Sequence, residues 1–100
     1  MTLADEWEAL MAIEPPEFPE AVNGIDLPML VDDASECVSI YLTTQYLGAV
    51  KRGTLRACHA ELQAILPTLS GPAVDYVGRL THLAGGVLLR DDFGRAGWLG

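Results

Sequence analysis

The stretch LRACHAELQAILPTL (residues 55–69) decides the fold class of this chain. Its apolar residues recur at intervals of three and four, which places them on one face of a helix. These residues are Leu55, Cys58, Leu62, Ile65, Leu66 and Leu69. Thr54 is expected to cap the helix, and Pro67 to make its last turn irregular. The pattern predicts an amphipathic helix that buries one stripe in a core.

A second helix is predicted just before it, over about 34–52. Asp33 is expected to cap this helix, with Glu36 three positions later as in a capping box. Gly53 is expected to end it. Its apolar residues occupy most sides rather than one stripe, which is typical of a central helix covered by two neighbours.

A third helix is predicted after the break at Ser70 to Pro72, over about 72–89. Its stripe includes Val77, Leu80 and Val87, and the pair Gly85–Gly86 weakens it. The remaining residues, 90–100, are expected to form a glycine-containing C-terminal tail.

The N-terminal third differs from this helical remainder. Residues 3–13 predict a short helix, which the three prolines of EPPEFPE (14–20) stop. An extended, irregular connector is expected there. Asn23–Gly24 is a turn signal that allows a very small hairpin.

The predicted fold class is therefore all-α: a small antiparallel bundle of three main helices, a short N-terminal helix and a proline-rich connector. A chain of 100 residues with 50% hydrophobic residues has room for one modest core. We expect one domain over 1–100, made of an acidic helix and connector (1–31), a helical core (32–89) and a tail (90–100).

The charge of the chain is strongly asymmetric. Its net charge is −8, yet residues 1–50 carry −10 and hold no Lys or Arg, whereas residues 51–100 carry +2. An acidic half repels phosphate backbones and anionic lipids, so direct binding to nucleic acid or to a membrane is disfavoured. A basic protein would be attracted. The alternative is that these acidic charges only solvate the protein or pair with its own arginines.

No catalytic or metal-binding pattern stands out. Cys58 and His59 lack the paired short spacings of a zinc site, and no serine or cysteine has a base at a recognisable spacing. With a turn at Gly53, Cys37 and Cys58 would lie too far apart for a disulfide bond. His59 and His82 are expected to be solvated or packed at an edge. We expect no enzyme activity, no cofactor and no metal.

The leading hypothesis is a non-enzymatic, cytoplasmic interaction module that binds a basic partner protein, as inhibitors, immunity proteins and antitoxins commonly do. This comparison rests on size and charge alone. The predicted partner-binding residues are Glu14, Glu17, Glu20, Asp32, Asp33 and Trp98.

The alternative hypothesis is structural: a helical homo-oligomer, such as a homodimer, or a subunit of a larger assembly. The high apolar content suggests that some apolar surface needs a partner. The residues expected to supply that surface are Ile40, Tyr41, Tyr46 and Leu47 of the central helix.

Overall fold

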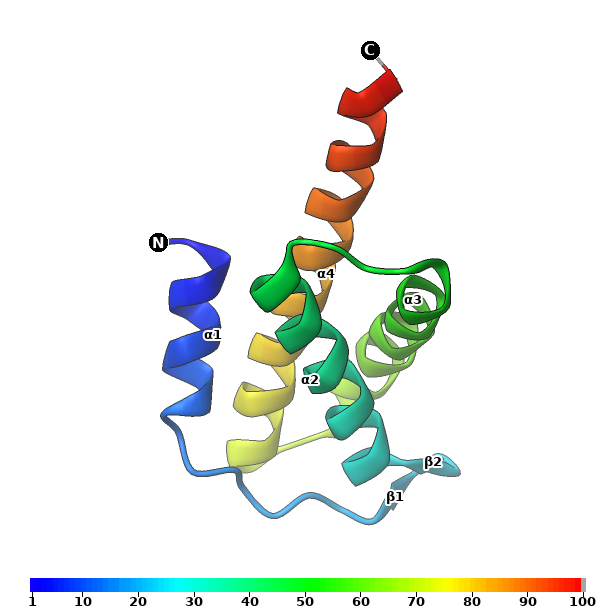
Figure 1. Ribbon diagram of the computed structural model, residues 1–100. Coiled ribbons are helices and arrows are strands. Elements are labelled where there is room, and N and C mark those ends of the chain that lie inside the picture. The colour runs from blue at the N-terminus through cyan, green and yellow to red at the C-terminus, as the bar shows by residue number, and fades with distance from the viewer. Residues whose placement is uncertain (100) are drawn as a thin grey trace.

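The computed structural model describes the backbone of residues 1–99 and the side chains of residues 1–93. Within these residues the chain forms four α-helices and one two-stranded hairpin, and the prediction of a small all-α fold is confirmed (Figure 1). Helices α2 (Leu27–Thr44), α3 (Ala49–Ile65) and α4 (Gly71–Leu99) pack against one another, and α1 (Leu3–Met11) packs against α4.

Helix α1 begins with a complete capping box. The Thr2 hydroxyl accepts a hydrogen bond from the Asp5 backbone N–H, and the Asp5 carboxylate accepts one from the Thr2 N–H, at 3.1 and 3.2 Å. These two bonds satisfy backbone donors that a helix N-terminus otherwise leaves open. The buried face of α1 presents Leu3 and Leu10 to the rest of the protein.

The connector after α1 is irregular from residue 14 to residue 19 and leads into a hairpin of β1 (Ala21–Val22) and β2 (Ile25–Asp26). Asn23 and Gly24 both have positive φ, of 51° and 80°, as a two-residue type I′ turn requires. The hairpin that this turn allowed is therefore formed, although it is only two residue pairs long.

Helix α2 starts earlier than predicted. Asp26, not Asp33, is its N-cap, and the Asp26 carboxylate accepts a hydrogen bond from the Met29 N–H at 3.0 Å. Pro28 occupies the first turn, where its missing N–H costs nothing. Asp33 therefore lies in the second turn of the helix rather than before it.

The predicted helix over 34–52 is wrong at its C-terminal end as well. Helix α2 ends at Thr44, and Gln45 adopts a left-handed conformation with φ of 60°. The next turn of chain buries Leu47 completely, and Gly48 is the N-cap of α3. Gly53 thus lies inside α3, and the Thr54 hydroxyl donates to the Val50 carbonyl instead of capping a helix.

The third predicted helix is longer than expected, and residues 90–99 are not an irregular tail. Helix α4 runs to Leu99, and its C-terminal turns (orange to red) extend beyond the ends of the other helices (Figure 1). Two ion pairs attach this part of α4 to α3: Arg52 with Asp91, and Arg56 with Asp92, both at 3.0 Å. Between α3 and α4, Pro67 lies in a 3₁₀ turn, Leu66–Thr68.

The core lies where the four helices meet. Its largest completely buried side chains come from every helix and from the loop before α3. Among them are Leu10, Leu27, Leu47, Leu55, Leu62, Ile65, Leu80 and Leu83. Tyr41 is buried too, so Tyr41 and Leu47 belong to the core and are not the exposed association surface predicted for them.

Candidate interaction surfaces

All five carboxylates predicted to bind a partner are exposed. Three of them lie on the connector and two on α2; they are Glu14, Glu17, Glu20, Asp32 and Asp33. Within the described residues none of the five takes part in an ion pair or a side-chain hydrogen bond. Of the five, Asp33 interacts with a cation through space, because it adds to the larger effect of Glu36 in raising the pKa of Lys51.

The fold brings some of these carboxylates together and separates others. The Phe18 ring packs edge-on against the Tyr76 ring, with centroids 5.5 Å apart, which holds the middle of the connector on α4. Burial, and next the charge of Asp32, raise the pKa of Tyr76, so Asp32 lies near the same ring. Glu17 and Asp32 thus belong to one end of the molecule.

Asp33 points elsewhere, because consecutive helical residues are about 100° apart. It lines a groove of about 400 Å³ between the hairpin, α2 and α3, together with Asp26 and Glu61. The exposed side chain of Met29 lies in the same groove. The acidic half therefore presents two groups of carboxylates, one at the connector and one beside α3.

The basic side chains of the second half are largely paired within that half. Arg52, Arg56 and Arg79 form ion pairs with Asp91, Asp92 and Asp75, at 3.0, 3.0 and 3.2 Å. Among the described residues only two ion pairs link the halves: Lys51 with Glu36 at 3.0 Å and His82 with Glu6 at 3.6 Å. Within the described residues the connector carboxylates Glu14, Glu17 and Glu20 take part in none of these ion pairs.

Trp98, the sixth predicted site residue, lies in α4, and its side chain is outside the described part of the structure. The described apolar side chains nearest to it in sequence are Leu89 and Phe93, which are 59% and 67% exposed. They are four residues apart, so they share one face of α4. The four-residue spacing of Leu89 and Phe93 is a sequence signal for this face, but it applies only if the segment is helical.

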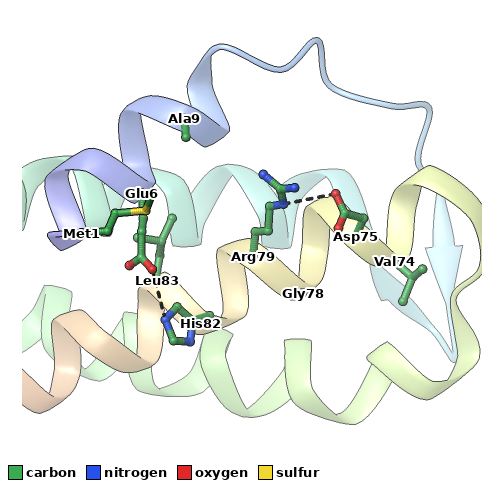
Figure 2. A pocket seen from close by; sticks show the side chains of 9 residues that line it. All are labelled: Met1, Glu6, Ala9, Val74, Asp75, Gly78, Arg79, His82 and Leu83. Carbon is green, nitrogen blue, oxygen red and sulfur yellow. Dashed lines mark ion pairs between the residues drawn. The ribbon is translucent and has the colours of Figure 1, made fainter.

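Two grooves follow the outer side of α4. The first, of about 490 Å³, lies between α1 and α4, and Figure 2 shows the residues that line it. Ala9, Gly78 and Leu83 supply small or apolar surface, and four ionisable side chains surround them: Glu6, Asp75, Arg79 and His82.

The second groove, of about 480 Å³, lies between α3 and α4 and shares Gly78 and His82 with the first. His59 lines it from α3 and packs against Gly85, because a Cβ built on Gly85 would lie 3.0 Å from His59 Nε2. Because glycine has no side chain, Gly78 and Gly85 leave space for these two grooves on the outer face of α4, which α1 and α3 flank.

The two histidines line this groove in different environments. His82 is exposed and contacts Glu6, whereas His59 is half-buried. No three His, Cys, Asp or Glu side chains in the described part of the chain are arranged to hold a metal ion.

Neither cysteine is an activated nucleophile. Both thiols are free and buried, and the Cys37 thiol lies 3.7 Å from the Lys51 carbonyl oxygen. Burial raises the pKa of Cys37, and it raises the pKa of Cys58 to about 11. At neutral pH both thiols are protonated, and only a thiolate is reactive.

Comparison with protein-family models, curated proteins and solved structures finds no match. No helix in the described residues is both long and apolar enough to span a membrane. The class of protein defined by the fold is a small all-α helical protein with an acidic N-terminal half.

Proposed function

We propose that this protein is a non-enzymatic interaction module whose acidic N-terminal half binds a basic surface of another protein. The proposal places the interaction in the cytoplasm, where buried thiols such as Cys37 and Cys58 stay reduced.

The observation that carries the proposal is that five exposed carboxylates of the connector and α2 form no ion pair within the described residues. Five carboxylates are exposed, and three arginines of α3 and α4, Arg52, Arg56 and Arg79, are paired instead with Asp91, Asp92 and Asp75. Charges that are not engaged within a protein remain available to steer and orient an oppositely charged partner.

The shape of this region favours a protein partner over a small ion. Glu17 borders a groove of about 410 Å³ that also exposes Val22, Leu69 and Pro72. Asp33 borders another that exposes Met29. Apolar surface beside carboxylates suits lysine and arginine side chains, which pack their aliphatic stems while their charged ends meet the acids.

The experiment is affinity capture from an extract of the native host, at low and at high salt, with the wild-type chain and two variants. In the first variant the five carboxylates become amides: Glu14→Gln, Glu17→Gln, Glu20→Gln, Asp32→Asn and Asp33→Asn. We expect a basic protein to be retained by the wild type at low salt, released at high salt, and lost from this variant.

The second variant is a control with the same net charge. It introduces lysine at five exposed, uncharged positions that line neither acidic groove: Thr43, Gly53, Ala60, Gln63 and Ala64. Since the acidic half is intact, we expect it to retain the partner. Equal loss from both variants would show that net charge alone matters, and retention by the amide variant would overturn the proposal.

A second candidate function is that of a structural subunit that associates through apolar helix surface. The observation that favours it is the exposure of Leu89 and Phe93 in the C-terminal part of α4. It differs from the first candidate because such association would depend little on salt.

A further inference from the structure

We propose that the outer face of α4 is a homodimer interface, in which two copies of the chain pair their α4 helices antiparallel. In this arrangement Phe93 of each copy enters the groove between α1 and α4 of the other copy. The inference is independent of the acidic surface and of any basic partner.

The first argument is that each copy carries both halves of the contact. Figure 2 shows a groove beside α4, floored by Gly78 and Leu83. The C-terminal part of α4 exposes Leu89 and Phe93, at 59% and 67%. A two-fold axis makes an interface from one surface used twice, so a groove and a protruding apolar side chain on one helix suit a dimer.

The second argument is register. His82, Gly85 and Leu89 follow one another at helical spacing, so the groove and the protruding face lie on the same side of α4. An antiparallel pair with its axis near Val87 brings Phe93 of one copy level with His82 of the other. The protruding turns of each helix then cover the groove of its partner.

The third argument is charge. A Cβ on Gly86 would lie 2.7 Å from the Leu3 side chain, so Gly86 faces α1. Arg90, one turn further along, is therefore on the same flank of α4 but beyond α1. It is exposed and has no ion-pair partner among the described residues.

The antiparallel arrangement gives Arg90 a partner. A two-fold axis keeps the α1 flank of one copy against the α1 flank of the other. The register places Arg90 of one copy level with Gly85 of the other, one turn from the His82 that contacts Glu6 there. Within its own chain Glu6 contacts only His82, at 3.6 Å, among the ion pairs of the described residues. The His82 side chain is charged only when it is protonated. A permanent cation from the second copy therefore complements Glu6.

The experiment is sedimentation equilibrium of the intact chain over a wide concentration range. We expect the wild type to reach twice the 10.8 kDa of one chain. Phe93→Asp is expected to weaken association at least about tenfold, as loss of a buried aromatic anchor does. Gly78→Leu, which changes the groove instead of the protruding helix, is expected to have the same effect.

A charge exchange tests the orientation of the two chains. We expect Arg90→Glu alone and Glu6→Arg alone to weaken the dimer, and the double variant to recover much of the loss. Val50→Asp is the matched control, because Val50 is 82% exposed on α3 and outside the proposed interface. Circular dichroism of each variant checks that helix content is unchanged.

The outcomes separate this proposal from the proposed function. Loss of the dimer in Phe93→Asp with retention of the basic partner supports it. A monomeric wild type at every concentration overturns it, as does equal weakening by Val50→Asp. Failure of the double variant to recover overturns the antiparallel orientation.

Discussion

Arg52 Nε in the first turn of α3 lies 3.0 Å from Asp91 Oδ2 in α4, and this contact is the more buried of the two that hold the C-terminal part of α4. The side chains are 22% and 6% exposed, and the Arg52 Nε–H makes no well-aligned hydrogen bond, so the interaction is mainly ionic. One turn further along α3, Arg56 pairs with Asp92, but both of those side chains are at least half exposed.

This difference predicts unequal effects of two similar substitutions. Arg52→Ala is expected to lower the free energy of unfolding by about 1–3 kcal/mol, because it removes a cation beside a buried carboxylate. Arg56→Ala is expected to cost about 0–1 kcal/mol, since solvent screens an exposed pair. Urea unfolding of both variants measures the difference, and equal losses would show that burial of Asp91 does not matter.

Alanine substitutions at two glycines of α4, Gly78 and Gly86, are also predicted to have unequal effects on the free energy of unfolding. A Cβ at Gly78 would meet only Leu66, at 4.0 Å, so Gly78→Ala should raise the free energy of unfolding by roughly 0.5–1 kcal/mol through helix propensity. A Cβ at Gly86 would lie 2.7 Å from Leu3 Cδ2. Gly86→Ala is therefore expected to lower the free energy of unfolding by about 1 kcal/mol, because Leu3 and α1 must move outward.

Urea unfolding in a Phe93→Asp background measures these effects without a contribution from association. The control is the pair Gly86→Ala with Leu3→Ala, where the smaller side chain removes the clash and the two changes should not be additive. Simple additivity would contradict the contact between Leu3 and Gly86.

The raised pKa of the buried Cys58 thiol predicts that the folded protein loses stability at alkaline pH. Burial raises the pKa of its thiol from 9.0 to about 11 in the folded protein, so the unfolded chain ionises first as the pH rises. Stability is therefore unaffected below about pH 9 and falls above it, by up to about 1.4 kcal/mol per pH unit, until the folded thiol also ionises. Raised pKa values of Cys37 and Tyr76 act in the same direction.

The check is the free energy of unfolding of the wild type and of Cys58→Ala across this pH range. Cys58→Ala leaves a cavity and is less stable throughout, but its decline with pH should be shallower. Identical slopes would mean that this thiol does not contribute.

Gln45 is predicted to be a site where glycine stabilises the protein. Its φ of 60° places a side chain in the left-handed region, and its backbone N–H donates to the Tyr41 carbonyl at 2.6 Å. Gln45→Gly should raise the free energy of unfolding by about 0.5–1 kcal/mol, even though it loses the side-chain bond to Leu42. Asn23→Gly is the control and should change little, because asparagine tolerates this conformation; thermal unfolding of both gives the comparison.

Local signals predicted the helical class and the turn at Asn23–Gly24, but not the boundary between α2 and α3. The apolar pattern continues through Tyr46 and Leu47, so nothing in the periodicity shows that the helix ends. The break forms because Leu47 enters the core, which depends on the packing of distant residues. The only local signs are the β-branched pair Thr43–Thr44 and Gly48.

The prediction of an irregular tail over residues 90–100 was wrong for a related reason. Its glycines favour an irregular chain, whereas the structure extends the helix and pairs Asp91 and Asp92 with α3. That stabilisation needs Arg52 and Arg56, which are far away in sequence. The exposure of the three connector carboxylates, Glu14, Glu17 and Glu20, was easier to anticipate, because side chains on a proline-rich connector have little core to enter.

The most direct measurement of the central claim is the association rate of the captured basic protein with the wild type and with the five-amide variant, at low and high ionic strength. The account predicts fast association for the wild type that falls steeply with salt, and a slower, nearly salt-independent rate for the variant. Equal rates and equal salt dependence for the two proteins would contradict a binding role for the acidic half.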